Sequence, residues 1–416
     1  MSGERNGGLR LSALASRLAP SPTIEVEERT RKLREAGVRV LSLGAGQPDF
    51  DTPEPIKEAA IAAIRAGATK YTAVGGTIEL RRAIADKLAR ENSIEVVPDQ
   101  IVASNGSKHS LYNALLVTLD PGDEVIVPAP YWVSYPEMVR LAGGRPIVVE
   151  TAETEGFRLS GERLAAAITP RTRALILNSP VNPTGAVLGR AEMEAIAEVV
   201  RRHDLLVITD EIYEKLVYDG AEAVSFATVA PDRRPATIVV NGVSKAYAMT
   251  GWRIGYAAAP LRVARAMVTF QGQSTSNPSS VSQAAAAAAL GLDDALLAPM
   301  LAEYARRREM VCARLDAIPG LRFAPPAGTF YVFPNVGELM AACGLASCDH
   351  LAARLLDEAQ VSVVPGGGFG AEGHLRLSFA APTGVIEEAL DRIAAFATAA
   401  PASGAQALPK SRRFGR

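Results

Sequence analysis

The chain has few cysteines and histidines, and this scarcity limits the kinds of site that it can build. Its 416 residues include 3 cysteines and 4 histidines, which cannot supply a disulfide framework. Cys343 and Cys348 lie close in sequence, but no nearby Cys or His pair completes a zinc pattern. We therefore expect no metal site, and we expect all three cysteines to behave as small apolar side chains.

Long apolar runs and an excess of one charge are also missing. The most apolar run, residues 284–292, is too short to span a bilayer and is followed by Asp293 and Asp294, so we expect a buried helix. Residues 1–8 are polar and glycine-rich, so we expect no signal peptide and a cytoplasmic protein. The 44 basic and 45 acidic residues are mixed along the chain. This mixture argues against nucleic-acid binding and favours small molecules or a second copy of the chain as partners.

Short apolar runs that alternate with helical patterns fill the middle of the chain. This alternation is typical of an α/β domain with a mostly parallel sheet. Most runs are almost continuously apolar, as expected when helices cover both faces of a strand. The expected strands are residues 100–103, 124–128, 146–150, 174–178, 205–209, 237–241 and 254–258, and the expected helices include 55–65, 79–91, 108–119 and 190–203.

The pattern changes near Pro319, where a smaller α+β unit is expected to begin. Its strands are predicted at residues 328–334 and 375–380, and its helices at 349–359 and 383–397. We predict four parts: an N-terminal arm that also forms part of the small domain (1–52), a large domain (53–318), a small C-terminal domain (319–400), and a disordered tail (401–416).

Polar clusters follow five of the expected strands. In open α/β sheets, ligands bind outside the carboxyl ends of the strands. We therefore expect these clusters to meet in one site at that edge of the sheet. They are residues 105–108, 129–132, 179–183, 210–211 and 243–245.

Lys245 is the first candidate for chemistry. It follows the expected strand 237–241 and precedes the sequence Thr-Gly-Trp-Arg-Ile-Gly at 250–255. Burial and nearby positive charge lower the pKa of an amine and favour the neutral nucleophile that forms an imine. Arg253 is a fixed cation suited to bind a phosphate. The alternative for Lys245 is a solvated surface side chain.

Asp210 ends an apolar run, where a carboxylate is costly to bury without a partner. The protonated nitrogen of a pyridine ring would be such a partner, with an attraction of about 4 kcal/mol at about 4 Å. A ring kept protonated withdraws electrons from a carbanion at a substrate Cα. The alternative is that Asp210 caps the following segment.

Three other groups suit the same ligand chemistry. Gly106 lies between a strand and a helix, where backbone N–H groups can bind a phosphate. Asn182, held between two prolines, can donate to a phenolate oxygen and to a carboxylate, although a plain turn is the alternative. Arg376 lies in an apolar strand pattern, and its guanidinium fits the α-carboxylate of an amino acid.

Taken together, these segments resemble the fold-type I aminotransferases of classes I and II, which use pyridoxal phosphate (PLP). Within that family the chain is most similar to bacterial aspartate aminotransferases of the Iβ type. The resemblance covers about residues 10 to 400 and implies a large domain with a mostly parallel seven-stranded sheet, plus a smaller α+β domain. Its segments are residues 44–50, 130–136, 178–185, 210–214, 244–255 and 374–378.

The resemblance also implies roles for individual residues. Lys245 would hold PLP as a Schiff base and then act as general base, and Asp210 would pair with the pyridine nitrogen. Tyr71 would reach the phosphate of a neighbouring subunit, which makes a homodimer the minimum unit. The other implied roles are the phenolate oxygen for Tyr213 and Asn182, ring stacking for Trp132, the phosphate for Gly106, Ser107 and Arg253, and the α-carboxylate for Gly46, Trp132, Asn182 and Arg376.

The sequence departs from the family pattern at one position. Many relatives have, three residues before the lysine, a serine that contacts the phosphate, and this chain has Gly242 there. Ser244 is present next to Lys245, and it remains a candidate for the phosphate.

Lys108 bears on the choice of substrate. It matches a position that recognises the distal carboxylate in the Iβ enzymes, although phosphate contact or a solvated side chain is equally open. Thr23 would line the same pocket in a closed form. We expect amino transfer from L-aspartate to 2-oxoglutarate by a ping-pong mechanism, with prephenate as an additional acceptor and aromatic or alanine specificity as alternatives.

Two other functions share parts of this pattern. A PLP-dependent carbon–sulfur lyase on the same fold would also contain Lys245, Asp210 and Arg376. A transcription regulator with an aminotransferase-like domain would add a helix-turn-helix domain, and the segment before residues 44–50 is too short for one. We therefore expect an enzyme.

Overall fold

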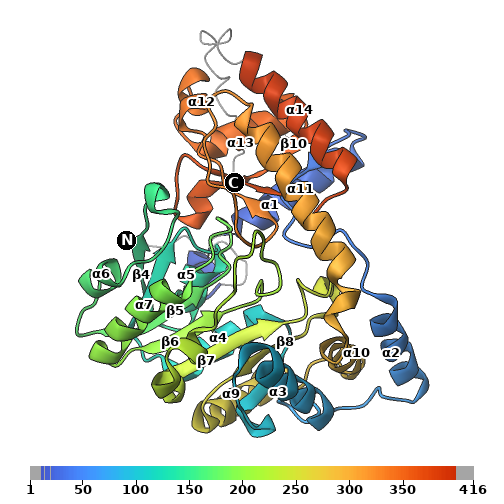
Figure 1. The fold of residues 1–416 in the computed structure, drawn as a ribbon, viewed down its shortest axis with the longest axis vertical. Coiled ribbons are helices and arrows are strands. Elements are labelled where there is room, and N and C mark those ends of the chain that lie inside the picture. Colours follow the sequence, from blue (N-terminus) through green and yellow to red (C-terminus); the bar gives the residue numbers. More distant parts are fainter. Residues whose placement is uncertain (1–10, 14, 19, 400–416) are drawn as a thin grey trace.

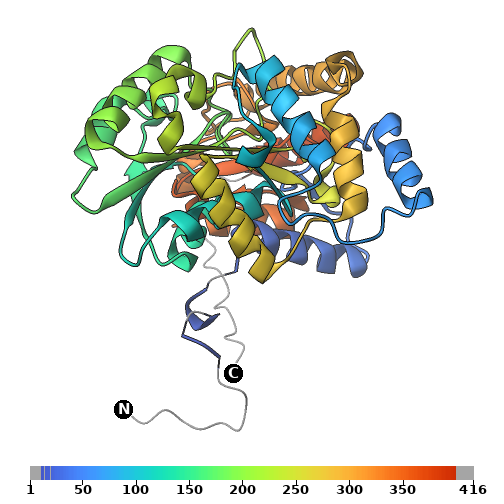
Figure 2. The ribbon, with the colours of Figure 1, turned by 90° about the horizontal axis from the view of Figure 1, so that it is seen from below.

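The computed structural model of the chain describes residues 11–13, 15–18 and 20–399. The N-terminal segment for which we expected no signal peptide (1–8) and the predicted tail (401–416) lie outside the described residues. The centre of the molecule is a seven-stranded sheet with helices on both faces, as Figures 1 and 2 show. This arrangement confirms the predicted α/β class.

All seven predicted strands of this sheet are confirmed, with ends that differ by at most two residues. Their order across the sheet is β2-β8-β7-β6-β5-β3-β4. The strand β8 runs antiparallel to both of its neighbours, and the other pairs are parallel. The strands are β2 (Ile101–Ser104), β3 (Glu124–Ala129), β4 (Arg145–Glu150), β5 (Thr172–Asn178), β6 (Leu206–Asp210), β7 (Thr237–Gly242) and β8 (Gly255–Ala258).

The register of the central strands aligns their carboxyl ends. Asn178 of β5 pairs with Asp210 of β6, and Asp210 pairs with Val240 of β7. Every residue of β6 and β7 is buried because both faces are covered, whereas β4 lies at the sheet edge and is partly exposed. The central strands therefore bring their final polar residues to one edge.

The predicted helices of the large sheet are also present. The apolar run at 284–292 falls mainly in α10, whose alanines 285, 286 and 289 are fully buried, and this helix packs against α2 and α3. Thr77 begins α3 by accepting a hydrogen bond from the Leu80 N–H at 3.2 Å. The helices are α2 (Glu54–Arg65), α3 (Ile78–Asn92), α4 (Ser107–Thr118), α5 (Ser134–Leu141), α6 (Gly161–Ala166), α7 (Arg190–His203), α8 (Phe226–Val229), α9 (Leu261–Ser274) and α10 (Ser280–Leu290).

A long helix, α11 (Ala298–Asp316), leads from the region of α10 to the C-terminal elements (Figure 1). These elements include a small antiparallel sheet of order β11-β12-β9. The strand predicted at 328–334 is shorter than expected because Thr329 adopts a left-handed conformation with φ of 65°. The elements are β9 (Tyr331–Val332), α12 (Gly337–Ala342), α13 (Cys348–Glu358), β10 (Val361–Ser362), β11 (Val364–Pro365), β12 (Leu375–Ser378) and α14 (Thr383–Ala399).

The N-terminal segment lies beside these C-terminal elements, as Figure 1 shows. Helix α1 (Pro22–Glu35) contacts β10 and β11. Strand β1 (Leu41–Ser42) pairs in parallel with β10, so that Leu41 faces Val361. The segment that follows β1 is thereby fixed between the two parts of the molecule.

Short 3-10 helices complete the backbone. They are Ala15–Arg17, Pro98–Gln100, Glu153–Glu155, Pro231–Ala236, Thr250–Trp252, Asp294–Leu296 and Gly366–Phe369. Among the described residues, no helix combines the length and the apolar character needed to cross a membrane.

Candidate active site

A cavity of about 280 Å³ lies at the carboxyl ends of the central strands. It brings together residues from the large sheet, the N-terminal helix α1 and the small antiparallel sheet. The predicted site residues that line it are Thr23, Gly46, Ser107, Lys108, Trp132, Asn182, Asp210, Tyr213, Ser244, Lys245, Arg253 and Arg376.

Lys245 lies in the loop after β7, and its amine faces the cavity. The Nζ atom donates to the backbone oxygen of Gly46 at 2.5 Å. Burial, together with the positive charges of Arg376 and Arg253, lowers the pKa of Lys245 to about 8. A substantial fraction of the amine is therefore neutral near physiological pH, as a nucleophile requires.

Asp210 is the last residue of β6, and only 4% of it is exposed. Its Oδ2 accepts a hydrogen bond from the Tyr135 hydroxyl at 2.7 Å, and its Oδ1 accepts one from the Ile212 N–H at 3.3 Å. Burial raises the pKa of Asp210 to about 6, although the Tyr135 hydrogen bond opposes this rise. Residues 211–215 form no helix, so Asp210 is not a helix cap.

Polar contacts connect Asp210 to Arg376 across the floor of the cavity. The Asn178 side chain donates to the Asp210 backbone oxygen at 2.8 Å and accepts from the Asn182 N–H at 3.0 Å. Arg376 donates to Asn182 Oδ1 at 3.2 Å and to the Gly44 backbone oxygen at 2.8 Å. Because Asn182 uses its oxygen for Arg376, its Nδ2 group is the end that can donate to a ligand.

The Nε atom of Arg376 is buried and has no hydrogen-bond partner among the described residues. An unsatisfied buried donor costs about 1–3 kcal/mol, and more for a charged group. An anion in the cavity would remove this cost. Arg376 therefore has the geometry of a carboxylate-binding residue.

An anion-binding arrangement lies at the start of α4. Gly106 precedes the helix with φ of 87°, and a Cβ at this position would lie 2.3 Å from Nη2 of Arg253. Arg253 donates to the backbone oxygens of Thr250 at 2.9 Å and Asn105 at 3.3 Å. Helix N–H groups and a guanidinium together suit a phosphate.

The unusual glycine at position 242 has a physical reason. A Cβ there would lie 2.7 Å from Ser107 Oγ and 2.9 Å from the Cα of Gly255. The start of α4 and strand β8 therefore leave no room for a side chain. Ser244 is buried and lines the cavity.

Lys108 lies at the wall of the cavity in this structure. Its Nζ is 4.8 Å from the ring centre of Trp132, and both residues line the cavity. Thr23 of α1 lines the same cavity. At this wall the ammonium group can contact either a distal carboxylate or a phosphate in the cavity.

A family model described as aminotransferase class I and II matches residues 38–393. The chain belongs to this family. It is 45% identical over 397 residues to the aspartate/prephenate aminotransferase of Nitrosomonas europaea, which covers 93% of this chain and 99% of that protein. It is also 45% identical over 388 residues to the aspartate aminotransferase of Geobacillus stearothermophilus, with 93% and 99% covered.

A solved structure supports the same assignment. The structure of the Thermus thermophilus aspartate aminotransferase with maleate superimposes with a TM-score of 0.88 at 44% identity, covering 94% of this chain and 100% of that one. The fold-type I architecture expected of this aminotransferase is thereby confirmed.

Two predicted residues of the aminotransferase do not line the cavity. Gly106 lies behind it, against Arg253. Tyr71 is 91% exposed in the single chain. Its contact with the phosphate of a neighbouring subunit stays a prediction.

Sequence reasoning missed two tyrosines that line the cavity. Tyr135 contacts Asp210, and the Tyr331 hydroxyl lies 3.0 Å from the Tyr213 hydroxyl. A tyrosine within an apolar pattern is usually a core residue, so neither Tyr135 nor Tyr331 was predicted as a site residue. The available signal was that a buried tyrosine hydroxyl needs a hydrogen-bond partner.

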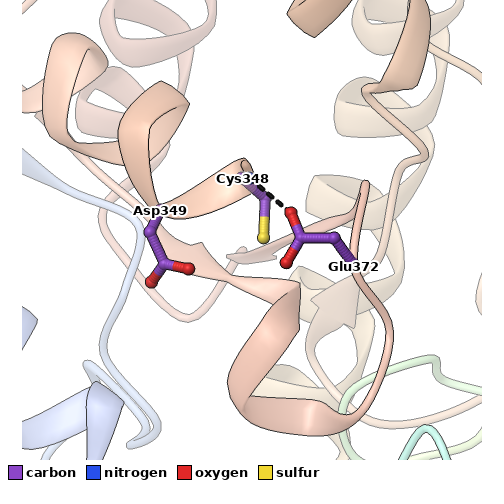
Figure 3. A group of neighbouring side chains, drawn as sticks. All are labelled: Cys348, Asp349 and Glu372. Carbon is purple, nitrogen blue, oxygen red and sulfur yellow. Dashed lines mark hydrogen bonds between the residues drawn. The ribbon is translucent and has the colours of Figure 1, made fainter. Parts of the chain in front are cut away.

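Cys348, Asp349 and Glu372 gather at the start of α13, away from the cavity (Figure 3). The Glu372 carboxylate accepts from the Cys348 N–H at 2.5 Å, and acidic groups stabilise a helix N-terminus. Burial raises the pKa of the Cys348 thiol to about 11. The thiolate that binds metals is therefore disfavoured, and a helix-capping role explains the cluster.

Proposed function

We propose that the chain is a PLP-dependent aminotransferase that transfers the amino group of L-aspartate to 2-oxoglutarate, giving oxaloacetate and L-glutamate. One observation supports this function best: the amine of Lys245, with its lowered pKa, shares a cavity with buried Asp210 and with Arg376. An imine-forming amine, an acid and a carboxylate-binding cation are the groups that amino transfer needs.

The cavity residues fit PLP at each of its polar groups. Lys245 suits the aldehyde, and Asp210, a buried carboxylate, suits a protonated ring nitrogen. Arg253, which can pack against the start of α4 because Gly106 has no side chain, suits the phosphate. Ser107 and Ser244 are further phosphate candidates, and Tyr213 and Asn182 are candidates for the phenolate oxygen. When bound, PLP supplies an aldehyde carbon that bonds to the amino nitrogen and a protonated ring that withdraws electrons from the substrate Cα.

Lys245 is also the residue placed to move a proton. A general base works best when its pKa lies near the working pH, and the pKa of Lys245 is about 8. In this role its Nζ would take the proton from the substrate Cα and deliver it to C4′, the aldehyde carbon of the cofactor. The Gly46 oxygen that accepts from Nζ holds the amine at the cavity wall.

Arg376 would hold the α-carboxylate of the amino acid. Its guanidinium is buried, and its Nε lacks a partner among the described residues. Asn182, Trp132 and the backbone of Gly46 would complete this binding site. A fixed carboxylate orients the Cα–H bond toward Lys245, and such positioning lowers the activation barrier.

Lys108 would select a substrate with a second carboxylate. A cation at the cavity wall favours aspartate and glutamate over neutral amino acids by charge attraction. The name of the Thermus thermophilus structure includes maleate, a dicarboxylate, which supports this choice. The Nitrosomonas europaea relative is named for prephenate as well as aspartate, so prephenate is the second acceptor that we propose.

Half-reactions of the purified chain test this function. The absorbance of bound PLP is followed after addition of aspartate, alanine, phenylalanine or cystathionine. We expect aspartate to react fastest, Lys245→Ala to abolish the reaction, and Lys57→Ala on the surface of α2 to leave it unchanged. If aspartate is no faster than alanine, the dicarboxylate assignment is wrong. Release of pyruvate from cystathionine without an oxo acid would instead indicate the carbon–sulfur lyase.

The assembly and the compartment stay predictions. A homodimer would bring the exposed Tyr71 to the phosphate site of its partner, and mixing inactive Tyr71 and Lys245 variants would test this by restored activity. The division into residues 1–52, 53–318 and 319–400 and the cytoplasmic location are proposed on the grounds given by the sequence.

A further inference from the structure

The hydroxyl of Tyr135 contacts the acid of the site directly. It lies 2.7 Å from Oδ2 of Asp210, and both residues are almost fully buried. Burial and the charge of Asp210 raise the pKa of Tyr135 well above its ordinary value. The phenol therefore stays protonated and must be the donor of this hydrogen bond.

We propose that Tyr135 is a positioning residue whose hydroxyl keeps the Asp210 carboxylate ionised and oriented for the ring nitrogen of the cofactor. This inference rests on the proposed function and adds to it a residue that acts through Asp210.

The hydrogen bond from Tyr135 is the shorter of the two that the Asp210 carboxylate accepts within the part of the chain that the structure describes. The ionisable groups that face it are Tyr135 from α5, Tyr213 from the turn after β6, and Lys245 from the loop after β7. The Tyr213 hydroxyl is paired with Tyr331 instead. Among the described residues, only the Tyr135 hydroxyl and the more distant Ile212 N–H donate to the carboxylate.

The position of Tyr135 is itself fixed. Its N–H donates to the Trp132 backbone oxygen at 3.0 Å, and its ring packs edge-on against the Trp132 ring with 5.4 Å between centres. The same ring belongs to the apolar core under α4 and α5. Replacing tyrosine by phenylalanine therefore removes the donor and leaves the packing in place.

Loss of this donor has a definite consequence for pH dependence. A hydrogen bond to the ionised carboxylate lowers the pKa of Asp210, and the pKa is about 6 with the bond present. In Tyr135→Phe the pKa of Asp210 rises toward neutrality. A protonated acid cannot attract a protonated ring nitrogen, so the cofactor is held less tightly in the lower part of the pH range.

The test measures the dissociation constant of PLP from the cofactor-free full chain, in a pH series that begins below the pKa of Asp210 and extends well above it. For Tyr135→Phe we expect an acidic limb displaced upward by about one unit, so that PLP affinity is about tenfold weaker below the wild-type pKa of about 6 and only about twofold weaker near neutral pH. Tyr218→Phe is the matched control, because its buried hydroxyl donates to the Thr329 backbone oxygen at 2.5 Å outside the cavity. We expect its PLP affinity to equal that of the wild type.

A double variant separates positioning from a structural effect. With Asp210→Asn already present, adding Tyr135→Phe should cause no further displacement of the pH profile. If the PLP affinity of Tyr135→Phe is lower by the same factor at every pH, or is not lower at all, the inference is wrong while the proposed function stands. A wild-type chain that fails to bind PLP would overturn both.

Discussion

The guanidinium of Arg376 lies 4.3 Å from the ring centre of Tyr331, and both side chains are almost fully buried. The aromatic face stabilises the positive charge. Arg376 forms hydrogen bonds only to neutral oxygens of the described residues. A buried cation held in this way retains its attraction for an incoming carboxylate.

Replacing Arg376 by lysine should therefore distinguish the contribution of its charge to carboxylate binding from that of its planar guanidinium. Arg376→Lys keeps the charge but loses the planar, two-pronged donor. We expect the KM for aspartate to rise on the order of tenfold to a hundredfold, as the loss of a charged hydrogen bond predicts. Steady-state kinetics measures the change. An unchanged KM would show that the α-carboxylate binds elsewhere.

The rate at which the cofactor-free chain captures PLP should rise with pH and level off above about 8, the pKa of Lys245. Because the charge of Arg376 lowers this pKa and the charge of Glu27 raises it, the two residues provide opposite tests. Arg376→Met should move the midpoint to higher pH, and Glu27→Gln should move it to lower pH. Stopped-flow absorbance gives both midpoints. If the midpoints of both variants move in the same direction, the electrostatic explanation of the Lys245 pKa is wrong.

Asp210→Asn should stabilise the cofactor-free chain and weaken PLP binding. The pKa of Asp210 is raised from 3.8 to about 6 in the fold. Its contribution to stability is therefore complete below the ordinary pKa and is lost as the pH rises to about 6. Above that pH, the asparagine variant should be up to about 3 kcal/mol more stable, measured by urea unfolding.

Glu211→Gln is the control for this prediction. Burial raises the pKa of Glu211 to about 7, but its carboxylate accepts from Thr209 and Ser225 and does not line the cavity. The glutamine variant should gain stability at alkaline pH and keep its PLP affinity.

The prediction for Asp210 itself has a clear contrary outcome. If Asp210→Asn destabilises the cofactor-free chain at alkaline pH, the raised pKa of Asp210 is wrong.

Gly106→Ala should weaken PLP binding more than its effect on folding explains. An alanine with φ of 87° costs about 1–2 kcal/mol, and its Cβ would displace Arg253. Gly122→Ala is a matched control, since φ is 94° and no atom lies within 4 Å of the added Cβ. Both variants should lose stability in thermal unfolding because of the positive φ. Only the first should lose PLP affinity in a titration.

Much of the fold could be predicted because the large sheet is covered on both faces. Strands such as β6 and β7 are fully buried and therefore appear as continuous apolar runs. The strands β1, β10 and β11 are only two residues long. Such short elements have no periodicity of their own and form through contacts between distant segments.

The site was predictable where charge or polarity stood out against an apolar strand. Lys245, Asp210 and Arg376 all satisfied that condition. Tyr135 did not, because its ring resembles a core residue and only the partner of its hydroxyl reveals another role. Glu27 enters the cavity through the docking of α1, which depends on contacts with β10 and β11.

The pairing of Leu41 with Val361 also sets an order of events during protein synthesis. Gly44 and Gly46, whose oxygens accept from Arg376 and Lys245, follow β1 directly. A ribosome releases the N-terminal segment long before it has made residue 361. The first strand of the growing chain therefore stays unpaired until residue 361 has been made, and the pocket can take its final shape only after that.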